Sequence, residues 1–449
     1  MRFLFLCFLT TSLYYAQDNK DLKELKTLIS SSKKVVLPIQ KVFSINGILQ
    51  LRDQQTLNGN GATIIQLKKN TPIISIKNTK TVIVENLTLI GKGDDYQPSS
   101  SSESVGIDCW GARDAIIRNN TLKKFSNIAI KGLRQINGIS VSGNKIIGTG
   151  VNQPEFYQKD LMGITLGGKN ISISKNEITL TSQGIMIAEG SDSITITNNK
   201  IYNLPLEHGV YVDTSCKNIL ISKNEISDIG GTGIKIQNRN LDGNFSENIQ
   251  IIDNLICNTK IGDGILVYNS EGKKLFAKIV LIRNNILNGI GQHGINIRET
   301  LHANVLFNQI SNVKYSGIYL RDNSYLKIES NKISTTQENG IFDEGSGQYI
   351  EIINNQFLNI GLAGNDHNGL SSGIFTEKGI NRKINDNFFD NSLNMAHAIY
   401  IADVADTSLE IKNNQFPQTR KVTLKIKGVA SKKIKLLNNK SEKQISIEY

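Results

Sequence analysis

The chain has 449 residues, 39% of them hydrophobic, with 38 glycines against 6 prolines. This length suits two or three ordinary domains or one large repetitive domain, and the composition excludes a largely disordered chain. The formal net charge of +11 points to a polyanionic partner or to a generally lysine-rich composition, and the lack of a nucleic-acid-binding motif favours an acidic polysaccharide over nucleic acid.

Residues 1–16 have the pattern of a secretory signal peptide. "MRFLFLCFLTTSLYYA" carries one Arg, then an apolar run, then a small residue at Ala16. The run is too short to cross a membrane, and no second long apolar stretch follows. We therefore expect a secreted or periplasmic protein without a transmembrane segment. Of the four cysteines, Cys7 lies in the predicted signal peptide. The other three, an odd number lying far apart, are expected to be buried free thiols: Cys109, Cys216 and Cys257.

Residues 17–33 are expected to form a short capping helix. Within "KDLKELKTLISSS" at 20–32, four apolar side chains recur at helical spacing: Leu22, Leu25, Leu28 and Ile29. An amphipathic helix of this kind can plug the open end of a stacked structure.

A first repeated unit has the form apolar-x-apolar-x-Asn-x-apolar, as in "ITITNNKI" at 194–201. The alternation has the period of a strand, and Asn tolerates the left-handed conformation that a sharp turn needs. Successive Asn positions lie 23–32 residues apart, at Asn176, Asn199, Asn224, Asn254, Asn285, Asn308, Asn331, Asn355, Asn387 and Asn414.

A second repeated unit has a small residue followed by apolar-x-apolar, as in "HGVYVD" at 208–213. Each repeat therefore holds about three short strands and no helix. One repeat cannot bury its apolar face, whereas stacked repeats can. The sequence predicts an all-β, single-stranded, right-handed parallel β-helix over residues 34–449, with about 12 coils, an Asn ladder and irregular coils after residue 421. Propeller repeats are longer, and sandwich strands do not repeat.

These Asn repeats and "GIxI" strands, over roughly residues 34–440, resemble the pectin-lyase-like superfamily of right-handed parallel β-helices. The resemblance implies a substrate groove along the sheet that follows the longest loops, here 148–162, 203–208 and 360–372. The superfamily contains polysaccharide lyases, glycoside hydrolases, uronan epimerases, tailspikes and adhesins. The acidic clusters of calcium-dependent pectate lyases and the paired aspartates of polygalacturonases do not appear in matching form.

Three columns of side chains are expected to face outward from the "GIxI" strands. The first contains His208, Thr232, Asp263, His293, Ser316, Asn339, Ser372 and His397. The second contains Tyr211, Lys235, Leu266, Asn296, Tyr319, Phe342, Phe375 and Tyr400. The third contains Asp213, Gln237, Tyr268, Arg298, Arg321, Glu344, Glu377 and Ala402. Aromatic rings and forked donors suit a sugar chain that carries carboxylates.

The residue types favour a lyase that cleaves a uronate-containing polysaccharide by β-elimination, because that reaction needs a base and a cation for the substrate carboxylate. The catalytic candidates are His293, Tyr268, Lys235, Arg298 and Arg321. The substrate-binding candidates are His208, Tyr211, Asp213, Asp263, Asn296, Tyr319, Phe342, Glu344, Glu377, His397 and Tyr400.

Structural roles compete with these assignments. Arg298 and Arg321 can instead pair with Glu299 and Asp322, and His293 can simply cap a turn. Asp263 is expected one coil from His293, where it can orient the imidazole.

Two other functional classes remain open. A glycoside hydrolase can use two carboxyl groups, for which Glu344 and Glu377, or Asp213, are the candidates. The same pair is a candidate Ca²⁺ site, and Ca²⁺ is the one cofactor considered. A non-catalytic, carbohydrate-binding or adhesive β-helix is the third class. Asp343, at a nominally inward position, indicates a local bend or a buried hydrogen bond.

Overall fold

The computed structural model describes most of the chain in two compact units, residues 1–207 and 208–449, which are taken in turn. The predicted signal peptide lies outside the described residues, as do most of the predicted loop at 148–162 and part of the loop at 360–372. The described ranges are 20–92, 104–125, 127–148, 162–239, 245–269, 277–364, 370–377, 380–390, 394–402, 408–416, 419, 421, 423–427, 434–441 and 447–448.

The first unit begins with the expected helix, at residues 20–31. Leu25 and Ile29 are buried on its apolar side. The Asp21 carboxylate accepts a hydrogen bond of 2.8 Å from the backbone N–H of Ser44 in the first coil. The helix therefore covers the apolar end of that coil, as predicted.

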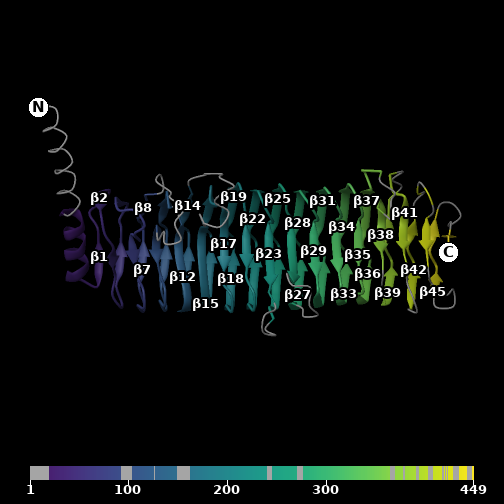
Figure 1. The fold of residues 1–449 in the computed structure, drawn as a ribbon, viewed down its shortest axis with the longest axis horizontal. Coiled ribbons are helices and arrows are strands. Elements are labelled where there is room, and N and C mark those ends of the chain that lie inside the picture. Colours follow the sequence, from purple (N-terminus) through teal and green to yellow (C-terminus); the bar gives the residue numbers. More distant parts are fainter. Residues whose placement is uncertain are drawn as a thin grey trace, which may run out of the picture. The chain divides into compact units, whose positions relative to one another are not determined.

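Short parallel strands form three faces in the first unit (Figure 1). One face holds β1 (Lys34–Val36), β4 (Thr56–Asn58), β7 (Ile83–Glu85), β10 (Ile116–Arg118), β13 (Ser140–Ser142), the C-terminal half of β15 (Met162–Ser174) and β18 (Asp192–Thr197). The next holds β2 (Val42–Ile45), β5 (Thr63–Gln66), β8 (Thr88–Ile90), β11 (Thr121–Lys123), β14 (Lys145–Ile147), β16 (Glu177–Thr179) and β19 (Lys200–Leu204). The third holds β3 (Leu49–Gln50), β6 (Ile74–Ser75), β9 (Val105–Asp108), β12 (Ile128–Asn137), the N-terminal half of β15 and β17 (Gln183–Ile187).

The second unit repeats this plan, and its faces are numbered by strand order within each coil. Face one contains β20 (Val210–Val212), β23 (Ile234–Asn238), β26 (Ile265–Asn269), β29 (Ile295–Arg298), β32 (Ile318–Arg321), β35 (Ile341–Glu344), β38 (Ser372–Thr376), β41 (His397–Ile401), β44 (Leu424–Ile426) and β47 (Ile447–Glu448). Face two contains β21 (Lys217–Ser222), β24 (Glu247–Ile252), β27 (Ala277–Arg283), β30 (Thr300–Leu306), β33 (Ser324–Glu329), β36 (Gln348–Ile353), β39 (Ile380–Asn385), β42 (Leu409–Lys412) and β45 (Ile434–Leu437). Face three contains β22 (Glu225–Ile229), β25 (Leu255–Thr259), β28 (Ile286–Ile290), β31 (Gln309–Val313), β34 (Lys332–Thr336), β37 (Gln356–Ile360), β40 (Phe388–Phe389), β43 (Gln415–Phe416) and β46 (Lys440–Ser441).

The strand pairings are parallel, and the apolar positions stack inside as predicted. Val210 pairs with Ile234, which pairs with Ile265, and none of the three is exposed. Among the described residues, the face of the first unit that contains β2 holds seven strands, and face three of the second unit holds nine. Each coil contributes one strand to these faces, so the chain has more coils than the roughly 12 expected. The Asn repeat did not predict the early coils, because Ala62 and Leu87 stand immediately before β5 and β8, where later coils have Asn.

An Asn ladder runs along one corner of each unit. The backbone N–H and side-chain Nδ2 of Asn308 both donate to Oδ1 of Asn331, each at 2.9 Å, and the pattern repeats from coil to coil. The left-handed conformation lies one residue earlier than predicted, for example at Phe307 (φ 56°) and Ser330 (φ 57°). The ladder Asn itself is buried and ties adjacent coils together, while its predecessor makes the turn.

The small residue before each face-one strand has a steric cause. A Cβ on Gly317 would lie 2.3 Å from Cγ2 of Ile333 and 2.8 Å from the carbonyl oxygen of Gly340. The same clash recurs at Gly294 and Gly340, so neighbouring coils approach closely along this line.

Asp343 points inward and forms a buried ion pair, so the predicted buried hydrogen bond exists. Its Oδ2 lies 2.7 Å from a guanidinium nitrogen of Arg382, with the side chains 0% and 2% exposed. Thr376 donates a further hydrogen bond to this oxygen, at 3.0 Å. The pair joins β35 on face one to β39 on face two across the interior. Cys109 and Cys216 are buried free thiols, as expected, and Cys257 is partly exposed.

Candidate functional site

Face one of the second unit presents the three predicted columns in the predicted register. In the strand register, Tyr211 lies opposite Lys235 on the next coil, and Arg298 lies opposite Arg321. The side chains are more deeply covered than an open solvent face would allow. The most covered of them, each less than 10% exposed, are Thr232, Asp263, Ser316, Asn339, Ser372, His397, Tyr211, Asn296, Tyr319, Phe375, Tyr400 and Asp213.

Asp263 is a buried carboxylate that links its own coil to the next one. Its carboxylate accepts hydrogen bonds from the backbone N–H of His293 (3.0 Å) and from Nδ2 of Asn296 (3.1 Å). Burial raises the pKa of Asp263 to about 6. Asp263 therefore orients the backbone of His293 rather than its imidazole, which differs from the sequence-based expectation.

The His293 imidazole is held from the other side. The backbone N–H of Ser316 donates to Nδ1 at 3.3 Å, so the ring proton lies on Nε2. The ring stacks on Tyr319 with centroids 4.6 Å apart. Burial, and secondarily the charge of Arg298, lower the pKa of His293 to about 4. At neutral pH the ring is therefore uncharged, with Nδ1 occupied by the Ser316 N–H and the proton on Nε2 available to donate a hydrogen bond.

Arg298 is the half-buried cation of this cluster. Its Nε donates to Oδ1 of Asn296 at 2.9 Å, and its guanidinium carbon lies 5.1 Å from the centroid of the Tyr319 ring. Burial and the adjacent Arg321 lower its pKa, while the carboxylates of Asp263, Glu299 and Glu344 act in the opposite direction. Among the described residues no carboxylate lies within ion-pair distance of it. Arg321 differs, because it pairs with Glu299 at 2.8 Å.

Tyr319 connects the cation to a carboxylate. Its hydroxyl donates a hydrogen bond to Glu344 on the next coil, while its ring packs against His293 and Arg298. The ring also contacts Phe342 edge-on, at 5.4 Å. A hydroxyl bonded to a carboxylate can pass its own proton on while accepting another.

A second cluster lies on the first coils of the unit. The Nζ of Lys235 is 3.1 Å from Nε2 of His208 and lies over the rings of Tyr211 (5.2 Å) and Tyr268 (5.6 Å). The N–H of Thr232 donates to Nδ1 of the same imidazole at 3.1 Å. Burial and the charge of Lys235 lower the pKa of His208 to about 3, so this ring is also neutral.

Asp213 belongs to this second cluster and forms an ion pair with Arg239. Arg239 lies 3.2 Å from its carboxylate and donates to the Tyr211 hydroxyl at 3.3 Å. Tyr211 in turn donates to Gln237 at 2.9 Å. Arg239 was missed from the sequence, although extending the alternation of Lys235 and Gln237 by two residues would have found it.

The remaining candidates lie further along face one. Phe342 stacks on Phe375 at 5.0 Å, and Phe375 on Tyr400 at 5.1 Å, giving a continuous aromatic strip. His397 lies 5.3 Å from Tyr400. The strip is separated from Lys235 by several coils, so the candidates form a line rather than one pocket.

The Ca²⁺ candidate receives no support from the geometry. Glu344 binds the Tyr319 hydroxyl, and Glu377 follows β38 on the neighbouring coil. Within the part of the chain that the structure describes, no group of three or more metal-binding side chains comes together. Two carboxylates alone are few ligands for a cation that takes six to eight oxygens.

Comparison with known protein families identifies the architecture. A family model described as "Right handed beta helix region" matches residues 47–239, 105–275 and 242–416. The chain belongs to this right-handed β-helix family. No curated protein sequence matches it significantly. No helix in the described part of the chain is long and apolar enough to cross a membrane.

Solved structures share this fold at low sequence identity. An exopolygalacturonase from Thermotoga maritima aligns with a TM-score of 0.53 and 12% identity, over 75% of this chain and 87% of its own. The tailspike protein of E. coli bacteriophage HK620, in complex with a pentasaccharide, aligns with a TM-score of 0.58 and 10% identity, over 94% and 76%. At such identities the likeness establishes the fold.

Proposed function

We propose that the protein binds a uronate-containing polysaccharide along face one of its second unit and cleaves it by β-elimination. The observation that carries this proposal is Arg298. A half-buried guanidinium is costly, and the carboxylates that act on Arg298, those of Asp263, Glu299 and Glu344, form no ion pair with it, so an anion that binds it directly would stabilise it. A uronate carboxylate matches the forked donors that remain.

The elimination chemistry follows from this pairing. Arg298 would neutralise the substrate carboxylate, which makes the neighbouring carbon-bound proton more acidic. Nε2–H of His293 would donate a hydrogen bond to the sugar, since the ring is neutral and its Nδ1 is occupied.

Tyr319 is the favoured base because it contacts both side chains. It would accept the carbon-bound proton as its own hydroxyl proton moves to Glu344, and it can return a proton to the departing glycosidic oxygen. Tyr268 and Lys235 stay as the other candidates.

The comparisons support a saccharide substrate without distinguishing the reaction. The exopolygalacturonase is named for a uronate polymer, and the tailspike holds a pentasaccharide. The chain's positive charge suits such a polymer. Export, for which residues 1–16 would serve, would bring the protein to extracellular polysaccharide.

The test is turnover of alginate, polygalacturonate and glycosaminoglycans, followed by the ultraviolet absorbance of unsaturated chain ends. Arg298→Ala should lower kcat/KM by about 100-fold or more, as expected for loss of a buried charge-assisted contact. Arg283→Ala, which removes an exposed arginine on β27, is the matched control and should keep full activity.

The alternatives give different results in the same assay. New reducing ends without that absorbance would indicate a hydrolase, with Glu344 and Glu377 as its candidate carboxyl groups. Retention of a polymer without any cleavage would indicate a binding or adhesive protein. Unchanged turnover in Arg298→Ala would refute the proposed site.

A further inference from the structure

A column of left-handed residues at the N-terminal end of face two changes character along the second unit. Each member lies one coil from the next by the strand register. The members, all with φ between 53° and 60°, are Asn218, Asn248, Ile279, His302, Tyr325, Tyr349 and Asn381.

The bulky members are unexpected at this position. Asn adopts the left-handed region readily, whereas β-branched and aromatic side chains are disfavoured there. Burial does not compensate, because Tyr325 and Tyr349 are 50% and 45% exposed. Strained residues that persist in the open commonly serve a function.

The aromatic members form a stack that ends at an open cavity. The rings of His302 and Tyr325 have centroids 4.9 Å apart, and Tyr325 and Tyr349 are also 4.9 Å apart with planes only 8° from parallel. On the next coil the column returns to the smaller Asn381. The space left there is part of a cavity of about 530 Å³, within the size range of ligand sites.

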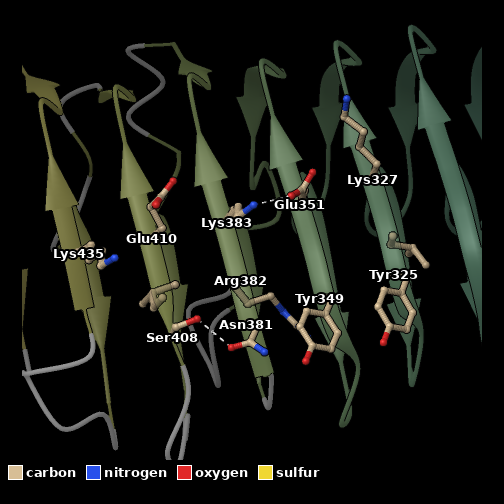
Figure 2. Close-up of a pocket in the computed structure, with 12 residues that line it drawn as sticks. Tyr325, Lys327, Tyr349, Glu351, Asn381, Arg382, Lys383, Ser408, Glu410 and Lys435 are labelled. Atoms are coloured by element: carbon tan, nitrogen blue, oxygen red, sulfur yellow. Dashed lines mark hydrogen bonds and ion pairs between the residues drawn. The ribbon is translucent and has the colours of Figure 1, made fainter.

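Polar groups surround this end of the stack (Figure 2). Ser408 donates to Oδ1 of Asn381 at 2.8 Å. Among the described residues nothing accepts a hydrogen bond from the Nδ2 of Asn381. Lys383 and Glu351 form an exposed ion pair of 2.8 Å across the cavity wall.

We propose that this cavity is a second saccharide-binding site, in which the ring of Tyr349 packs against the C–H face of one pyranose unit. The negative face of an aromatic ring attracts the weakly positive C–H groups of a sugar. Asn381, Glu351 and Lys383 supply donors and acceptors for its hydroxyls. The site lies on face two, whereas the proposed groove follows face one, so it would hold the polymer rather than cleave it. Its ligand class rests on the proposed function.

The experiment is a calorimetric titration with oligosaccharides of polygalacturonate and of alginate. Arg298→Ala serves as the background, because it should weaken binding in the groove and slow turnover by the factor given above. Adding Tyr349→Asn should weaken binding about tenfold, the effect expected of one aromatic contact. The unfolding temperature should stay equal or rise, since Asn suits the left-handed backbone.

Phe307→Asn is the matched control. Phe307 is also aromatic, 52% exposed and left-handed (φ 56°), but it does not line the cavity. Its replacement should leave affinity unchanged. Equal affinity with and without Tyr349→Asn, an equal loss in both variants, or no binding of either probe by the background protein would overturn the site. Cleavage is measured separately, so a failed lyase assay leaves this result interpretable.

Discussion

Arg298 and Arg321 are successive members of one column, yet their surroundings differ. Glu299 forms an ion pair with Arg321, whereas Arg298 donates to the amide oxygen of Asn296, packs on the face of Tyr319 and interacts with carboxylates only at longer range in the described structure. Stacking two cations on adjacent coils is unfavourable, and within the described structure only Arg321 forms a direct ion pair. This asymmetry assigns anion binding to Arg298 in our proposal, and a supporting role to Arg321.

The buried carboxyl of Asp263 should produce a measurable pH dependence. Its pKa is about 6 in the folded protein, against an ordinary value of 3.8. Between these values the folded state binds more protons than the unfolded state, so the free energy of unfolding falls as pH rises. The loss approaches about 3 kcal/mol, at about 1.4 kcal/mol per pKa unit.

Asp263→Asn should remove this fall in the free energy of unfolding with rising pH, because the amide does not ionise. Urea unfolding at a series of pH values should show the variant gaining stability relative to the wild type between pH 4 and 7. Asp253→Asn changes an exposed aspartate and should follow the wild-type curve. His293 acts in the opposite sense, because a lowered histidine pKa makes stability rise with pH over that interval. A constant difference between Asp263→Asn and wild type would contradict the assigned burial.

Between elements, the ion pair of Asp343 and Arg382 links β35 to β39 through the interior. Removing one partner leaves a buried charge uncompensated, so Asp343→Ala should lower the free energy of unfolding by about 3–5 kcal/mol. Replacing both, as in Asp343→Leu with Arg382→Met, should recover most of the loss, as measured by urea unfolding.

An exposed pair offers the comparison. Lys145 and Glu177 lie 3.0 Å apart with 47% and 36% of their side chains exposed. Lys145→Ala should leave stability within experimental error, since water screens such pairs. A stable Asp343→Ala variant would mean that the buried pair contributes little.

Element positions were predictable because each strand repeats a simple local pattern. The alternation around Val210 and Val212 predicted which side chains face inward, and the register placed Tyr319 beside Phe342 as expected. Arg382 was not predictable, because its partner lies 39 residues earlier and on another face. The protonation of His293 likewise depends on the N–H of Ser316 in the next coil.

At the scale of a whole unit, the Asn ladder joins each coil to the next by side-chain hydrogen bonds. Oδ1 of Asn308 accepts from both the N–H and the Nδ2 of Asn285, at 2.9 and 3.0 Å. Asn308→Ala leaves the buried N–H of Asn285 unpaired, at about 1–3 kcal/mol, and removes one acceptor of its Nδ2, which still donates to the carbonyl of Ile251 at 2.9 Å. Chemical unfolding should therefore show a loss of at least this size.

Asn354→Gly tests whether this loss is specific to the ladder. Asn354 is exposed, has a φ of 54° and donates a side-chain hydrogen bond to Ser330 on the surface. Glycine adopts that conformation freely, so stability should change little. Similar losses in Asn308→Ala and Asn354→Gly would mean that the turn, not the amide ladder, dominates.

The ladder hydrogen bonds are the same whether few or many residues separate two successive ladder asparagines. Asn308 meets Asn331 after 23 residues, while Asn355 meets Asn387 after 32, through the same pair of hydrogen bonds. Because the amides re-establish alignment on every coil, a connection can lengthen without shifting the strands that follow. Insertions between successive ladder residues can therefore add new surface over a face while the strands of the following coils stay in register.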